Sequence, residues 1–252
     1  MIIDTHAHIT KEYYENVDEE ISKDKNIVLI NSGTNHPDCK EIIDLCKKHT
    51  NCYGTIGIHP SEVDNWQEET VTFLENNINK KKIVAIGEIG LDYHYGEDRE
   101  KQKEIFVKQL EIAKKYSKAV VIHSREALED TYNILKKYPE LKKIMHCYSY
   151  DEKEVNKFLE INCLIGINGI VTFKNNSNIK KTIEKIGIKN IVLETDSPYL
   201  SPEPYRGKTN SISNIYIIAA KIAEILNLNI DQVIRETTQN AIQQFDLDLQ
   251  KW

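Results

Sequence analysis

The first ten residues contain a pair of histidines whose spacing suits metal binding. The segment reads Asp4-Thr5-His6-Ala7-His8 and lies in a short apolar run. In a β-strand, residues two apart point to the same side, so His6 and His8 would face one space together. Two converging imidazoles suit a borderline divalent metal. The pair alone leaves ordinary surface or core histidines equally open, because exposed strands carry such pairs by chance.

Further residues of metal-ligating type stand late in other apolar runs. Glu88 lies in IGEIGLD, where a carboxylate among isoleucine and glycine needs a partner to offset its burial. His123 closes VVIHS, His146 lies in IMHCYS and Asp196 follows VLET. The set uses four of the eight histidines in the chain. This constellation indicates a metal site more strongly than it indicates packing.

Eight short apolar runs alternate with polar, helix-periodic stretches, which is the pattern of βα units. The predicted strands are Met1–Ile9, Ile27–Gly33, Cys52–His59, Ile83–Leu91, Ala119–His123, Lys143–Cys147, Cys163–Ile170 and Ile191–Thr195. An open doubly wound sheet is the alternative, but no glycine-rich phosphate motif follows the first run. We therefore predict a single (β/α)8 TIM barrel spanning residues 1–252. The candidate ligands then meet at the carboxyl ends of its strands, where barrel enzymes build their active sites.

Six ligands are too many for one tetrahedral ion and fit two ions about 3.5–4 Å apart, bridged by a carboxylate. Glu88 is the expected bridge. The first and eighth strands adjoin in a closed barrel, so their ligands should share one ion. Those of the fifth and sixth strands should share the other. Four histidines favour Zn, Mn, Co or Ni over Mg.

These residues stand in motifs that resemble the TatD family of metal-dependent deoxyribonucleases, within the amidohydrolase-like barrels. The resemblance runs nearly end to end, through DTHAHI, GIHP, GEIGLDY, IHSREA, HCYS, GINGIVTFKN, LETDSPYLSPEPYRGK and TTQNAIQQF. It implies the same division of ligands: His6, His8 and Asp196 on one ion, His123 and His146 on the second, and Glu88 between them. It also implies Mg as a working metal, since family nucleases are commonly described as Mg-dependent.

The resemblance implies a 3′–5′ exonuclease acting on single-stranded DNA or RNA. An ester or amide hydrolase on the same scaffold, such as a D-aminoacyl-tRNA deacylase, is the nearest alternative. Many amide-cleaving relatives use a modified lysine where Glu88 stands, which favours phosphodiesters. An inactive nucleic-acid-binding scaffold is an alternative of another class, and the intact ligand set argues against it.

We predict Asp196 and Glu88 as the catalytic residues, with Asp196 orienting and deprotonating the attacking water. Glu194 and Asp92 are expected to orient ligands rather than bind metal. His59, in GIHP, is expected to contact substrate or protonate the leaving oxygen, and a packing role is equally open.

Positive contacts to substrate are expected from Arg206, Lys208, Lys174 and Arg125, which follow predicted strand ends. Each is equally open to being a solvated surface cation, and Arg206 is the preferred candidate. The substrate loop departs from the family pattern PYRGKRNEP at Thr209 and Ser211, which replace a basic and an acidic residue.

The composition restricts the partners. With 33 Lys+Arg and 39 Asp+Glu, the formal net charge is 33 − 39 = −6, which argues against a protein that coats nucleic acid by bulk charge. Two divalent ions would concentrate positive charge at the barrel mouth. No apolar run approaches the roughly 18 residues of a membrane span, and no signal peptide is evident. Five cysteines without a CxxC pair indicate free thiols, so a cytoplasmic location is expected. The protein is also expected to be a monomer.

Overall fold

The computed structural model describes residues 1–94 and 98–249 and confirms the predicted (β/α)8 barrel. Eight parallel strands pair in chain order, from β1 to β8. Their bounds are β1 Ile2–Ala7, β2 Ile27–Ser32, β3 Cys52–Ile56, β4 Ile83–Asp92, β5 Ala119–Arg125, β6 Lys143–Met145, β7 Cys163–Ile167 and β8 Ile191–Leu193. Every predicted strand is present, and seven of the eight begin at the predicted residue.

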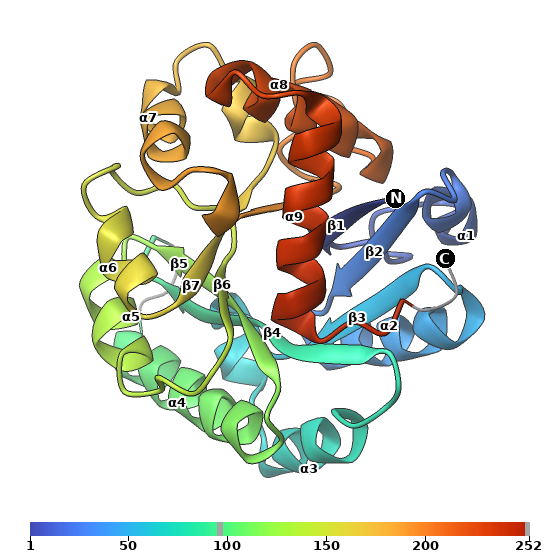
Figure 1. Ribbon diagram of the computed structural model, residues 1–252. Coiled ribbons are helices and arrows are strands. Elements are labelled where there is room, and N and C mark those ends of the chain that lie inside the picture. The colour runs from blue at the N-terminus through green and yellow to red at the C-terminus, as the bar shows by residue number, and fades with distance from the viewer. Residues whose placement is uncertain (95–97, 250–252) are drawn as a thin grey trace.

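Helices follow the strands and surround the sheet (Figure 1). Their bounds are α1 Val17–Ser22, α2 His36–Lys48, α3 Glu68–Asn77, α4 Arg99–Lys115, α5 Leu128–Leu135, α6 Val155–Glu160, α7 Ser177–Ile186, α8 Ile215–Leu226 and α9 Ile230–Phe245, with short 3-10 turns η1 Pro60–Asn65, η2 Gly169–Thr172, η3 Ile188–Asn190 and η4 Ile212–Asn214. Within the described ranges, no helix is long and apolar enough to cross a membrane.

Several strands end earlier than the sequence predicts. The ladder stops before His8, His59, His146 and Asp196, so these side chains lie in the loops directly after β1, β3, β6 and β8. Pro60 follows His59 and cannot donate to a strand ladder, because proline has no N–H. These four residues are therefore carried by loops anchored to strand ends, whereas His6, Glu88 and His123 lie within β1, β4 and β5.

The seam between β1 and β8 is closed by side-chain and loop contacts. The buried Asp4 carboxylate accepts hydrogen bonds from Thr195, at 2.9 Å from its N–H and 2.6 Å from its hydroxyl. The Asp196 N–H donates to the His6 carbonyl at 2.9 Å. Burial raises the pKa of Asp4 to about 7, although the bonds from Thr195 act in the opposite direction. The seam thus holds His6 of β1 beside Asp196, which follows β8.

The inside of the barrel is filled by a cluster of apolar side chains to which all eight strands contribute. The end of α9 packs against this cluster through Ala241 and Phe245, and Leu247 follows just beyond it. Figure 1 shows α9, in red, lying across the middle of the ring of strands. Because α9 also contacts β1 and β8, it covers the seam as well as the interior. One opening of the barrel is therefore closed by apolar packing.

Truncating Phe245 tests this closure. The side chain is 3% exposed, and Phe245→Ala should lower the free energy of unfolding by about 3–5 kcal/mol, as expected for a large core cavity. Gln243→Ala, at an exposed position of the same helix, should change it by less than about 0.5 kcal/mol. Urea denaturation followed by circular dichroism measures both. Equal stability of the two variants would show that α9 is not part of the core.

Candidate metal centre

Glu88 lies at the centre of the candidate ligands and offers one carboxylate oxygen to each side. Its Oε2 is 3.3 Å from Nε2 of His6 and 3.5 Å from Nε2 of His8. Its Oε1 is 2.9 Å from Nδ1 of His123 and 3.9 Å from Nε2 of His146. A carboxylate placed between two sets of imidazoles in this way has the geometry that a bridging ligand requires.

Asp196 approaches the same cluster from the loop after β8. Its Oδ1 lies 3.5 Å from Nε2 of His146, 3.6 Å from that of His8 and 3.8 Å from that of His6. Burial alone would raise the pKa of Asp196, but the neighbouring imidazoles, His146 above all, lower it. The residue is 7% exposed and its carboxyl group is ionised. It is therefore available both as a ligand and as a proton acceptor.

Backbone and hydroxyl groups of β2 orient His6, in β1, and His8, just after it. Nδ1 of His8 is 2.9 Å from the Ser32 carbonyl, which can only accept, so this nitrogen carries the hydrogen. Nε2 of His8 then presents its lone pair to the cluster. Nδ1 of His6 is 3.1 Å from Oγ of Ser32, and the two Nε2 atoms are 3.0 Å apart. Two imidazole nitrogens directed at one point form a donor set that fits a divalent cation.

Two acids, Asp92 and Glu194, contact the other two candidate histidines. Oδ2 of Asp92 is 2.9 Å from Nε2 of His123, and Oε2 of Glu194 is 3.0 Å from Nδ1 of His146. Oε1 of Glu194 is itself 3.2 Å from the side-chain nitrogen of Asn168. A carboxylate paired with the far nitrogen of a ligating histidine fixes its ring and raises its basicity. Both acids lie where the sequence expects residues that orient the ligands.

The grouping of the ligand atoms differs in one respect from the expected division. Atoms within 4.8 Å of one another form three sets: His6 with His146 and Asp196, His6 with His8 and Glu88, and His59 with Glu88 and His123. The His146 ring stacks on that of His6 at a centroid distance of 3.6 Å. His146 thus lies beside the β1 histidines, whereas the sequence pairs it with His123. The number of ions and their division among the ligands stay predictions.

His59 lies beside Glu88 as a neutral hydrogen-bond donor. Its Nδ1 accepts the Ser61 N–H at 3.1 Å, and burial lowers the pKa of the imidazole to about 3. The hydrogen is therefore on Nε2, which is 3.6 Å from Oε1 of Glu88. This arrangement suits donation of a hydrogen bond to a substrate oxygen. It does not suit protonation of a leaving group at neutral pH.

The four predicted cations lie on loops or strand ends on the side of the ligands. The Arg206 guanidinium lies 4.3 Å from the centre of the Phe173 ring, so the loop after β8 packs on the loop after β7. Lys208 and Lys174 are exposed. Arg125 is the last residue of β5 and is half-buried. Arg206 is therefore held against a neighbouring loop at this end of the barrel.

The two departures from the family loop pattern lie in different surroundings. Thr209 is exposed. The Ser211 hydroxyl donates to Oε1 of Glu20 at 2.5 Å and accepts from Nζ of Lys23 at 3.1 Å. Position 211 therefore packs the loop against α1 rather than serving the ligand cluster.

Sequence reasoning missed Asn210, which organises the loop after β8. This side chain is 1% exposed, and its Nδ2 donates to the carbonyls of Thr195 at 2.9 Å and Tyr199 at 2.7 Å. The hydroxyl of Tyr14 donates to the Asn210 carbonyl at 2.8 Å. Only its place in the motif that follows the DSPYL segment could have drawn attention to it.

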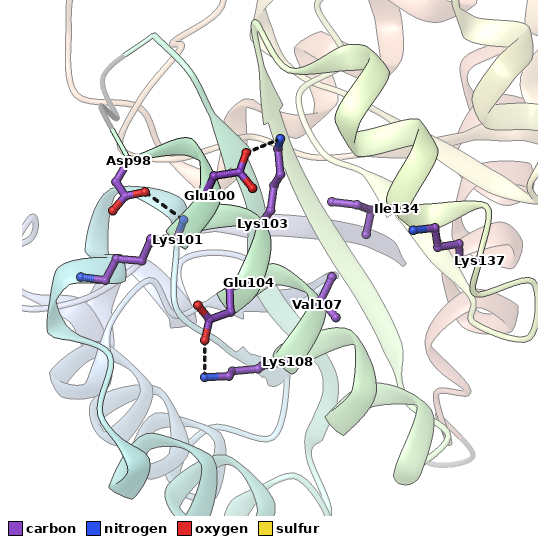
Figure 2. A pocket seen from close by; sticks show the side chains of 9 residues that line it. All are labelled: Asp98, Glu100, Lys101, Lys103, Glu104, Val107, Lys108, Ile134 and Lys137. Atoms are coloured by element: carbon purple, nitrogen blue, oxygen red, sulfur yellow. Dashed lines mark hydrogen bonds and ion pairs between the residues drawn. The ribbon is translucent and has the colours of Figure 1, made fainter.

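A surface pocket along α4 and beside α5 contains none of the predicted site residues (Figure 2). Its lysines are largely paired: Lys103 with Glu100 at 2.9 Å and Lys108 with Glu104 at 2.8 Å. Paired charges of this kind are typical of a solvated helix surface. We therefore place the metal chemistry at the ligand cluster and not in this pocket.

Comparison with known families agrees with this geometry. The family model described as TatD related DNase matches residues 3–246. The chain belongs to the TatD family. It is 32% identical to the "Uncharacterized metal-dependent hydrolase YabD" of Bacillus subtilis, over 98% of this chain and 100% of that protein. It is 29% identical to the "Uncharacterized metal-dependent hydrolase YcfH" of Escherichia coli K12, over 98% and 96%.

Solved structures show the same TatD fold. The TatD homologue YjjV of Escherichia coli K12 superposes with a TM-score of 0.90 at 23% identity, covering 98% of each chain. A TatD family hydrolase of Entamoeba histolytica gives 0.86 at 24% identity, covering 97% of each. With the family relationship and a His/Glu/Asp cluster able to hold metal, the protein is a metal-dependent hydrolase of the TatD family.

Replacing Glu88 tests the bridging role. In Glu88→Ala both groups of histidines lose their shared carboxylate, so bound metal should fall to a small fraction of the wild-type content. Turnover should fall by about 10³-fold or more, because the ions supply several kcal/mol of transition-state stabilisation. Elemental analysis and a hydrolysis assay measure the two effects.

The matched control is Glu100→Ala, which removes an acid with an 85% exposed side chain on α4. It should leave both quantities unchanged. Full metal content in the Glu88 variant would contradict the bridge.

Metal affinity should rise with pH. Although burial opposes it, the pKa of His123 is raised to about 9 by Asp92 and Glu88, and that of His146 to about 10 by Glu194 and Asp196. These imidazoles therefore hold protons at neutral pH, and an ion that binds them must displace those protons. Apparent affinity should increase from pH 6 towards pH 9, with release of protons. Calorimetric titration of chelator-treated protein with Mn²⁺ in two buffers measures this. A constant affinity without proton release would refute it.

Proposed function

We propose that the protein is a divalent-metal-dependent phosphodiesterase that removes nucleotides from the 3′ end of single-stranded DNA or RNA. The observation that carries the proposal is the placement of Glu88, whose two oxygens face different histidines. A dinuclear centre of this kind suits in-line displacement at phosphorus, because two ions can stabilise the attacking and leaving oxygens together. The description of the family model, TatD related DNase, supports the same reaction class.

The residues of the cluster divide the work of such a reaction. Divalent ions held by these ligands would supply Lewis-acid activation of water and of the phosphodiester. Asp196, ionised and beside three imidazoles, accepts the proton of the attacking water. His59 donates its Nε2 hydrogen to a phosphoryl oxygen. Glu88 holds the two groups of ligands at a fixed separation.

The proposal extends to the cofactors, the substrate contacts and the setting. We propose two ions of the Zn, Mn, Co, Ni or Mg group. Arg206, Lys208 and Arg125 contact the phosphates that flank the scissile bond, and the protein works as a monomer in the cytoplasm. All five cysteines are free thiols, which fits a reducing compartment. The net charge of −6 fits metal-anchored binding of a strand end better than coating of a duplex.

The reaction class can be tested with matched substrates. The metal-loaded protein should shorten a 5′-labelled single-stranded oligonucleotide from its 3′ end and should leave a blunt duplex largely intact. A chelator should abolish the reaction, and added Mn²⁺ or Mg²⁺ should restore it. Asp196→Asn should lower kcat by about 10²–10⁴-fold, as expected for loss of a general base.

Two outcomes would overturn this proposal. Release of the amino acid from D-aminoacyl-tRNA without shortening of DNA or RNA would indicate the deacylase. Tight binding of oligonucleotides by metal-loaded protein that cleaves none of these substrates would indicate a scaffold.

A further inference from the structure

An exposed aromatic ring lies beside the candidate metal ligands. In the part of the chain that the structure describes, four large hydrophobic side chains are exposed, and two of them are tyrosines of the loop after β8. Tyr199 is 48% exposed and lies three residues after Asp196. Its ring is 6.0 Å from that of His8, in an edge-to-face arrangement. An exposed aromatic ring in contact with a candidate ligand is placed where it can touch a substrate.

Tyr13 extends this ring contact away from the cluster. Its half-buried ring meets that of Tyr199 at a centroid distance of 5.7 Å and an interplanar angle of 68°. The rings of His8, Tyr199 and Tyr13 thus form a continuous row, which we call the aromatic row. It begins at a candidate metal ligand and ends on the loop after β1.

The backbone of the aromatic row is fixed. The Tyr199 N–H donates to the Asp196 carbonyl at 2.8 Å, and the Tyr199 carbonyl accepts from Asn210 at 2.7 Å. The Tyr13 N–H donates to the Thr10 carbonyl at 3.1 Å. A ring held in place before binding loses little conformational freedom when a ligand stacks on it. The loop therefore holds Tyr199 at an exposed position before any ligand binds.

The chemistry of the row suits a nucleobase. Phenol side chains are uncharged at neutral pH, so neither Tyr13 nor Tyr199 carries a charge that would repel a phosphate chain. Aromatic side chains bind single strands by stacking on unpaired bases, with little dependence on which base is present. We propose that Tyr199, supported by Tyr13, is the stacking platform for the base next to the scissile phosphate.

This assignment rests on the proposed function and names the residues that would give it its preference for single strands. A base can lie on the row only when it is unpaired, so the platform favours single-stranded ends over duplex ends. Because the row touches His8 directly, a stacked base places the adjoining phosphate close to the candidate metal ligands. Tyr199 thus acts as a positioning residue, and its removal should weaken binding more than turnover.

Substitutions at Tyr199 test the platform in the metal-loaded enzyme. Tyr199→Ala should raise KM for a single-stranded oligonucleotide about tenfold, in the range measured for loss of one stacked base, and leave kcat within about twofold. Tyr199→Phe keeps the ring and should retain wild-type KM. Tyr205→Ala is the control, because Tyr205 is 44% exposed in the same loop but is not in the aromatic row. Its KM should stay at the wild-type value.

An abasic substrate separates stacking from other effects. The wild type should bind an oligonucleotide whose 3′-terminal dinucleotide is abasic about tenfold more weakly than the intact one, and Tyr199→Ala should bind the two alike. Equal discrimination by both enzymes, or a KM of Tyr199→Ala equal to that of the wild type, would overturn the platform while the nuclease function stands. Failure of the wild type to cleave any oligonucleotide would overturn the proposed function itself.

Discussion

The burial of one negative charge organises the functional end of this barrel. Glu88 is 3% exposed, and an isolated carboxylate in such a position costs several kcal/mol unless it is compensated. Burial acts to raise its pKa, yet His59, His6 and His123 hold that pKa well below the usual value. The acid and the imidazoles are therefore stable only together. A parallel barrel provides this meeting place, because the carboxyl ends of all its strands converge on one opening.

The same requirement explains why the β1–β8 seam is built from polar contacts. The Asp4 carboxylate binds Thr195, and the loop after β8 continues into Asp196, whose N–H is bonded to the His6 carbonyl. Asn210 then fixes the far side of the same loop. These buried hydrogen bonds set the separation between a β1 histidine and Asp196. Packing alone would close the barrel without fixing that separation to the accuracy that metal ligation needs.

The sequence predicts the strand starts and the identity of the converging residues because both depend on local pattern. Apolar runs mark the strands, and a buried acid or histidine at the end of a run is conspicuous in the printed sequence. Strand ends are less predictable, because a ladder stops where the neighbouring strand diverges. The position of His146 beside His6 depends on ring stacking and on Glu194, which directly follows β8 and is far along the chain. The role of Asn210 depends on the folded shape of the loop after β8, and a loop has no hydrophobic periodicity from which that shape could be predicted.

Charge and stacking complement each other at this mouth. A chain with a net charge of −6 has no general attraction for a polyanion, and its acids are needed to hold metal. Added lysines near the cluster would compete with the ions for those same carboxylates. Neutral aromatic rings avoid this conflict, because they bind bases by stacking and carry no charge that competes with the ions. An acidic protein that acts on nucleic acid can therefore gain affinity from rings such as Tyr199. In such a protein, bound metal ions and a few basic side chains contact the phosphates. Under the proposed function, this division favours strand ends, where a base is free to leave the stack of its neighbours.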